Sequence, residues 1–181
     1  MSKRVNYGEL SLMPYTIQDG FPSMGDSYIM SLYDEMERNH QLRWVFFSGG
    51  VSNREEWLAF IKSRINPFWV MVDWSNIRPD DYPKAYGHIL LTDCKKKYAN
   101  VHFCFFRCND KLKYASIFTK EMMRIMDFET LIGLTPVTNI KINQFMEQVP
   151  GFKKLGVVPK SSWDETEKKT VDSVIYYFEA S

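Results

Sequence analysis

Hydrophobic residues recur at helical spacing in four segments of the chain. In the first, Ile29, Leu32, Tyr33 and Met36 fall on one face and acidic residues fall on the other, which predicts an amphipathic helix. A later segment has a Met-rich stripe, a composition that is more often adaptable core than functional surface. The predicted helices cover residues 27–39, 52–66, 112–128 and 140–149.

The second predicted helix has signals at both ends. Ser52 stands three residues before Glu55, a capping-box arrangement, and Pro67 follows the last turn. Its apolar stripe includes Ile65, and the stripe of the third predicted helix includes Ile125. We expect both isoleucines to be buried.

Seven shorter segments are apolar or alternate between apolar and polar residues, which predicts strands. Short turn-rich connections at 78–81 and 94–97 predict that the second, third and fourth strands form an antiparallel meander. Residues 159–170 are rich in charge, and we expect them to form a loop. The predicted strands cover residues 5–13, 68–74, 84–93, 100–107, 130–135, 152–158 and 171–178.

The order of these elements predicts an α/β (α+β) fold, in which one mixed, mostly antiparallel sheet of about seven strands is flanked by about four helices. The segment 84–93 contains no Pro and suits a central position in the sheet. No internal repeat, low-complexity segment or linker interrupts the chain. We therefore expect residues 1–181 to form a single domain.

Composition narrows the class of protein. A hydrophobic fraction of 45% and an aromatic fraction of 15% exclude disorder, and a net charge of +1 gives no reason to expect nucleic acid or a membrane as a partner. We see neither a segment long and apolar enough to span a bilayer nor an apolar core of signal-peptide length near residue 1. The three cysteines form no CxxC pair, and Cys104 lies in an apolar strand, which predicts a reduced core thiol in an intracellular or virion setting.

The stretch from residue 130 to residue 156 combines a strand, an Asn, a helix and a Gly-Phe pair. The strand holds residues 131–134, Asn139 opens the helix, and Gly151-Phe152 precedes a strand that contains Gly156. With this stretch, the chain resembles the GNAT superfamily of acyl-coenzyme A (acyl-CoA) N-acyltransferases. The resemblance covers nearly the whole chain in topology and is best at the motif level over residues 100–158.

The resemblance implies transfer of an acyl group, such as acetyl, from acyl-CoA to an amine by direct attack in a ternary complex. It implies that CoA lies between the strands at 100–107 and 130–135, without a metal. Asn139 has a local alternative, because Asn is a preferred residue for capping the start of a helix. The residues that the resemblance implies for cofactor binding are Phe103, Cys104, Phe105, Arg107, Lys111, Lys113 and Asn139.

Two histidines are candidates for the catalytic base that takes a proton from the amine. His88 and His102 lie in the middle of neighbouring predicted strands, and an unperturbed imidazole suits a base near pH 7. We expect His102 to be the base. The alternative is that both are core histidines satisfied by hydrogen bonds. Their spacing with the cysteines and acids matches no metal site that we recognise.

The chain departs from the family pattern in two places. Family members carry a Gly-rich pyrophosphate loop at the start of the third helix, whereas residues 107–115 contain no Gly and place Tyr114 where one is expected. A Tyr in the fourth helix often protonates the leaving thiolate, whereas Phe145 and Met146 stand here. Tyr176 or Tyr177 on the last strand is a possible substitute.

These departures keep two other functions open. One is an inactive GNAT-like structural or binding protein, similar to chains encoded by some bacteriophages and carried in the virion. The other is a module that binds a different small molecule. An enzyme would have a protein or small-molecule amine as its partner and a cytoplasmic location, whereas an inactive protein would have protein partners or associate with itself.

Overall fold

The computed structural model describes residues 5–7, 10–45, 50–74, 82–106, 108–164 and 167–179. They group into two compact units. The first takes the described residues of Met1–Leu42, Val51–Leu90 and Phe103–Asn109, and the second takes the others. Each unit is described by itself below.

The helices agree closely with the prediction. Four of the five described helices match the predicted ones, and the fifth is a single short turn, α2. Among the described residues, no helix is both long and apolar enough to cross a bilayer. The helices are α1 (Asp26–Arg38), α2 (Leu42–Val45), α3 (Arg54–Lys62), α4 (Lys111–Met126) and α5 (Ile140–Gln148).

The main sheet is mixed and mostly antiparallel, as predicted, with the strand order β1-β2-β5-β6-β7-β8-β10-β9. Of the pairs whose register is described, only β7 and β8 run parallel. β3 (Ile17–Gln18) and β4 (Phe21–Pro22) form a separate small hairpin. The strands of the main sheet are β1 (Val5–Tyr7), β2 (Leu10–Pro14), β5 (Phe68–Asp73), β6 (Lys84–Thr92), β7 (Tyr98–Phe105), β8 (Thr130–Pro136), β9 (Lys153–Asp164) and β10 (Lys169–Glu179).

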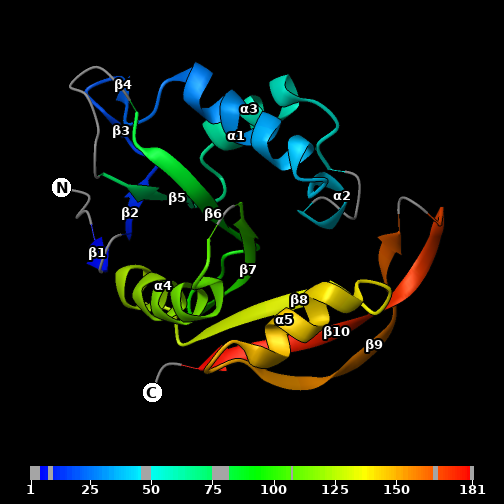
Figure 1. The fold of residues 1–181 in the computed structure, drawn as a ribbon. Helices are drawn as coiled ribbons and strands as arrows, with labels where there is room; N and C mark the ends of the chain where they lie inside the picture. Colours follow the sequence, from blue (N-terminus) through cyan, green and yellow to red (C-terminus); the bar gives the residue numbers. More distant parts are fainter. Residues whose placement is uncertain are drawn as a thin grey trace. The chain divides into compact units, whose positions relative to one another are not determined.

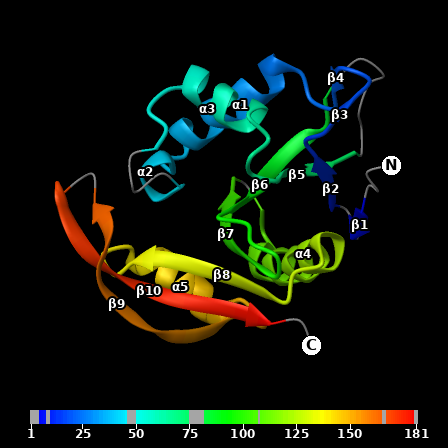
Figure 2. The same cartoon turned by 180° about the vertical axis from the view of Figure 1, so that it is seen from behind.

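The first unit packs α1 and α3 side by side (Figures 1 and 2). Trp57 of α3 is fully buried, and its indole N–H donates to the Ile29 carbonyl of α1 at 3.0 Å. The same ring meets Phe68 of β5 edge to face, with 5.4 Å between the ring centroids. One tryptophan therefore ties both helices to the sheet, and the buried NH finds the partner that a core indole needs.

The start of the chain differs from the prediction of one strand over residues 5–13. Tyr7 pairs with Leu10, and Val5 pairs with Leu12, so the segment folds back on itself as the hairpin β1–β2. This division gives the main sheet eight described strands, in agreement with the prediction of about seven. Loose alternation of apolar residues hides such a reversal, because both arms of a hairpin keep the same period.

The second predicted helix is shorter than expected at both ends. The N-cap is Asn53 rather than Ser52, and the Asn53 side chain accepts from the Glu56 amide, while Ser52 donates to the Glu56 carboxylate. The helix ends at Lys62, before Pro67, which leaves Ile65 78% exposed. The prediction that Ile125 is buried was also wrong, since this residue lies in the last turn of α4 and is 40% exposed.

The predicted charged loop at 159–170 was wrong for most of its length. β9 continues through Pro159 to Asp164 and pairs with β10. Lys160 takes a positive φ of 48°, and its amide donates to the Asp172 side chain at 2.9 Å, which carries the strand past the proline in a bulge. Pro159 is tolerated because β9 is an edge strand, and one side of an edge strand makes no hydrogen bonds to another strand of the sheet.

In the second unit, α5 lies along β8 and β10 (Figures 1 and 2). Gly133 of β8 makes room for the helix, because a Cβ there would lie 2.8 Å from the Met146 methyl. After α5, Gly151 turns the chain with a φ of 99°, and Phe152 returns to the core against Phe178. The Gly-Phe pair therefore ends the helix and returns the chain to the core.

Gly87 provides a test of the fold in the first unit. Its φ is 154°, and an added Cβ would lie 2.1 Å from the Cys104 carbonyl oxygen of β7. Because the clash is with backbone, we expect Gly87→Ala to lower the free energy of unfolding by at least about 2 kcal/mol. Urea unfolding measures this change. Gly156→Ala in β9 is the matched control, since its Cβ would meet nothing within 4 Å, and an equal loss in both variants would contradict the assignment.

Candidate functional site

The parallel ladder between β7 and β8 is short. It pairs Tyr98 with Thr130, Ala99 with Leu131 and Asn100 with Ile132. β8 continues to Pro136 and stays paired with β10 along this length. Among the described residues of the second unit, the edge of β8 from Gly133 to Thr135 therefore has no strand partner on the side away from β10. Such an edge offers backbone N–H and C=O groups to a ligand.

His102 lies on β7, two residues beyond the last pair of this ladder. Its side chain is partly buried, and its Nε2 is 2.9 Å from the Thr92 Oγ1 of β6. Burial lowers the pKa of His102 below its usual value, and the negative charge of Asp93 opposes this effect. The imidazole is therefore neutral at pH 7, which is the form that accepts a proton.

His88 has different surroundings, in the first unit. It is fully buried among aromatic rings, with centroid distances of 5.4 Å to Trp57, 5.4 Å to Phe68 and 6.0 Å to Phe106. A side chain with no solvent-accessible surface cannot exchange a proton with a substrate without a rearrangement. Of the two histidines, His102 is the better placed for acid–base chemistry.

The end of β7 carries three of the predicted cofactor residues. Phe103 and Phe105 stack with 6.1 Å between centroids, and the buried Cys104 thiol donates to Gln41 Oε1 at 3.4 Å. Burial raises the pKa of this thiol far above its usual value, so it is an inert core group, as predicted. Gln41 also donates to the Phe105 carbonyl at 2.6 Å, which occupies one acceptor of the β7 backbone. Arg107, a further predicted residue, lies outside the described residues.

The N-terminus of α4 is suited to an anion. Its first turn carries the exposed Lys111 and Lys113 and no acidic residue, and the N-cap Asp110 makes no side-chain hydrogen bond to the helix. The helix dipole and the first amide groups favour negative charge at this point. Tyr114, which stands where the family has a Gly, is buried and stacks on Phe118 at 5.5 Å, so its ring belongs to the core.

Asn139 is the N-cap of α5. Its side chain is buried and accepts a hydrogen bond from the Ile142 amide at 3.3 Å, which confirms the local capping role. Asn143, one turn later, donates to the Pro136 carbonyl at 2.9 Å and fixes the helix start to the end of β8. The cofactor contact implied for Asn139 stays a prediction.

Tyr176 does not replace the missing helix tyrosine. Its ring is fully buried, and its hydroxyl lies against α5, 3.1 Å from Asn143 Oδ1 and 3.5 Å from Glu147 Oε1. Burial, and then the charge of Glu147, raise its pKa to about 12. Glu147 also lies near Lys154 of β9, which places the Tyr176 hydroxyl on the β9 side of α5. Phe145, one of the two residues where the family has its tyrosine, instead contacts Lys111 of α4. Tyr176 therefore has a structural role in holding α5 on the sheet.

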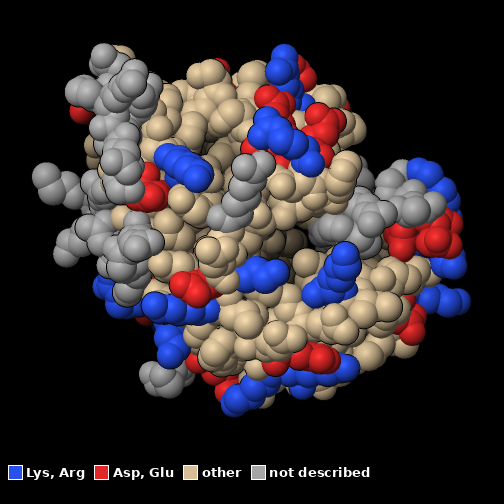
Figure 3. Space-filling view, viewed as in Figure 1, with Lys and Arg blue, Asp and Glu red and all other residues tan. Residues whose placement is uncertain are grey.

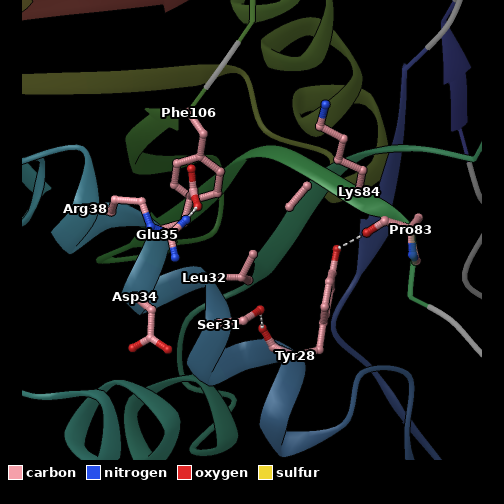
Figure 4. A pocket seen from close by; sticks show the side chains of 10 residues that line it. Tyr28, Ser31, Leu32, Asp34, Glu35, Arg38, Pro83, Lys84 and Phe106 are labelled. Carbon is pink, nitrogen blue, oxygen red and sulfur yellow. Dashed lines mark hydrogen bonds and ion pairs between the residues drawn. The ribbon is translucent and has the colours of Figure 1, made fainter.

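A recess of about 390 Å³ lies in the first unit between α1 and the start of β6. Figure 4 shows Tyr28 closing one side, where its hydroxyl donates to the Pro83 carbonyl at 2.9 Å, with Phe106 opposite and Leu32 between them. Glu35 and Arg38 pair at its rim, and Lys84 adds a second cation. Charges of both signs line it, which gives no preference for an anionic or a cationic ligand.

Charge elsewhere on the surface is similarly mixed. On the face drawn in Figure 3, Lys and Arg side chains alternate with Asp and Glu among uncharged residues. Most described ion pairs are between exposed side chains, which contribute little to stability. In the described part of the chain, no three His, Cys, Asp or Glu side chains gather in a way that would hold a metal ion.

No protein-family model matches the sequence, and no curated protein matches it. The fold, in contrast, matches solved structures along nearly its whole length. An acetyl transferase from Salmonella typhimurium, which modifies the N-terminal serine of a 50S ribosomal subunit protein, has a TM-score of 0.74 at 11% identity, covering 99% of this chain and 100% of that one.

Two further structures show the same likeness. A GNAT-family acetyltransferase from Bacillus anthracis has a TM-score of 0.72 at 12% identity, covering 98% of both chains. The spermidine N-acetyltransferase from Vibrio cholerae, in complex with CoA and spermine, has a TM-score of 0.63 at 14% identity, covering 96% of both. The chain therefore has the fold of the GNAT acetyltransferases, which confirms the predicted fold class.

The cap at Asn139 is testable by substitution. Asn139→Ala removes the acceptor for the Ile142 amide, and we expect it to lower the free energy of unfolding by about 1 kcal/mol. Asn139→Ser keeps an acceptor oxygen at the cap and should recover most of this loss. Urea unfolding of the three proteins measures the difference, and equal losses in both variants would show that the side chain acts by packing instead.

The lowered pKa of His102 makes stability depend on pH. Below pH 6.5 the unfolded chain takes up a proton that folded His102 resists, so the free energy of unfolding should decrease as pH falls from 7 toward 5. His102→Asn should remove this part of the dependence, whereas His40→Asn, at an exposed position, should retain it. Urea unfolding at several pH values measures both slopes. A slope in His102→Asn equal to that of the wild type would contradict the assignment.

Proposed function

We propose that this protein transfers an acyl group from acyl-CoA to an amine. The observation that carries the proposal is the early end of the β7–β8 ladder. In the described part of the second unit it leaves a backbone edge of β8 without a strand partner, near the neutral His102. The likeness of the fold to acetyltransferases supports it. His102, the β8 edge, the start of α4 and α5 all belong to the second unit.

The described residues fit acyl-CoA at two points. The β8 edge from Gly133 to Thr135 would pair with the amide groups of the pantetheine arm, as a strand would. Lys111 and Lys113, with the N-terminus of α4, would hold the phosphates. The phosphates would be bound by lysine charges and helix amides rather than by a Gly-rich pyrophosphate loop. We therefore expect the affinity for acyl-CoA to depend strongly on ionic strength.

His102 would act as the base in the reaction. The bound thioester supplies an activated acyl group, and His102 would take the proton of the attacking amine, directly or through one water. The other contribution is positioning of the two substrates, together with backbone N–H groups of the β8 edge directed at the carbonyl oxygen. Met146 packs against Gly133 and has no proton to give, and neither has Phe145. We therefore propose that the CoA thiolate leaves unprotonated and takes its proton from solvent.

The acceptor is proposed only by class. The Salmonella structure is that of a protein that modifies the N-terminal serine of a ribosomal protein, and the Vibrio structure is that of a spermidine acetyltransferase. Both substrates are amines, one on a protein and one on a small molecule. We propose an amine acceptor here and leave the choice between these two sizes to an acceptor screen.

The absence of a family-type tyrosine and of glycine in the first turn of α4 favours one other candidate, a GNAT-like protein that binds partners without catalysis. A cytoplasmic or virion location and a bacteriophage origin stay predictions from the sequence. Binding of acyl-CoA separates the two candidates. The acyltransferase requires it, whereas we expect a partner-binding protein that has lost its phosphate site not to bind acyl-CoA.

Isothermal titration of acetyl-CoA into the purified protein tests the proposal. We expect micromolar binding, weakened roughly tenfold in Lys111→Gln/Lys113→Gln, because each cation near a phosphate contributes about 0.5–1 kcal/mol. Lys120→Gln, in the same helix but away from its start, should bind like the wild type. Absence of heat at millimolar ligand, with an unchanged melting temperature, would exclude the acyltransferase function.

A further inference from the structure

Thr92 is the last residue of β6, and His102 lies on the adjacent strand of the β6–β7 hairpin. The 2.9 Å between Thr92 Oγ1 and His102 Nε2 is a normal hydrogen bond that spans the two strands. Thr is β-branched and its χ1 is restricted in a strand, so the position of its hydroxyl oxygen is fixed. The imidazole is therefore held at one of its two nitrogens.

We propose that Thr92 is a positioning residue, whose hydroxyl accepts the Nε2–H of His102 and thereby leaves the lone pair on Nδ1 to act as the base. The proposal rests on the function proposed above. In a neutral imidazole one nitrogen carries the proton and the other carries a free lone pair. The hydrogen-bond partner of one nitrogen decides which of the two is protonated. Thr92 would touch neither acyl-CoA nor the amine.

The surroundings of the pair favour this direction of the hydrogen bond. Asp93, next to Thr92, is the group whose charge acts on the imidazole. Its Oδ2 accepts from Asn100 Nδ2 at 2.8 Å, and no described hydrogen bond joins this carboxylate to the imidazole. The Thr92 hydroxyl is then the group at hydrogen-bond distance from Nε2 that can accept.

Two variants separate the effect of the Thr92 hydroxyl from that of the side-chain shape. Thr92→Val keeps the branched shape and removes the hydroxyl, whereas Thr92→Ser keeps the hydroxyl. Thr92→Val should lower kcat by roughly threefold, since only part of the imidazole then has the active tautomer and the ring loses its fixed orientation. The KM for acetyl-CoA should stay within about twofold, and Thr92→Ser should recover most of kcat.

The direct test is the tautomer of His102, read from the ¹⁵N chemical shifts of the imidazole in the neutral protein. The His102 signal is assigned by its loss in His102→Asn. We expect the Nε2–H form in the wild type and in Thr92→Ser, and a mixture of both forms in Thr92→Val. The Nδ1–H form in the wild type, or an unchanged spectrum in Thr92→Val, would overturn the proposal.

This measurement does not need activity. If acetyl-CoA fails to bind, the function proposed above falls, while the tautomer still decides whether Thr92 orients His102. If Thr92→Val does not fold, as judged by its melting temperature, the wild-type tautomer alone supports or overturns the assignment.

Discussion

The parallel pairing of β7 with β8 extends over three residue pairs, and the chemistry proposed here depends on where it stops. A parallel neighbour normally pairs with a strand along its full length. Among the described residues of the second unit, β8 is paired along its full length with β10 alone. A backbone edge without a partner is costly to bury and useful to a ligand. The end of the ladder thus creates a place where an extended molecule can replace a strand.

The elements with strong periodicity could be predicted from the sequence. α1, α4 and α5 carry apolar stripes long enough to exclude a strand, and β5 and β6 are apolar runs between turn residues. The errors occur where the sequence gives a local signal that the rest of the fold overrides. Pro159 indicates a loop, but an edge strand with a bulge accommodates it; residues 5–13 keep one alternation across two strands.

The candidate site was predictable only in part, because a site depends on which strands lie side by side. His88 and His102 have equivalent positions in the sequence pattern. In the structure, however, three aromatic rings enclose His88, whereas His102 is hydrogen-bonded to the Thr92 hydroxyl. Thr92 and Gln41 were missed. Thr92 lies ten residues from His102, across the predicted turn at 94–97, so a local signal existed for this pair. Gln41 lies 64 residues from the carbonyl that it binds, and no local pattern indicates that contact.

The bulge in β9 has a consequence for the protein in a crowded solution. β9 is a twelve-residue edge strand with Leu155 and Val157 exposed on it, a combination that invites pairing with the edge of another molecule. Lys153 and Lys154 place charge at its start, and Pro159 with the left-handed Lys160 interrupts the row of amide groups in its middle. These residues limit how long a foreign strand can remain in register, so they protect the folded protein against edge-to-edge aggregation.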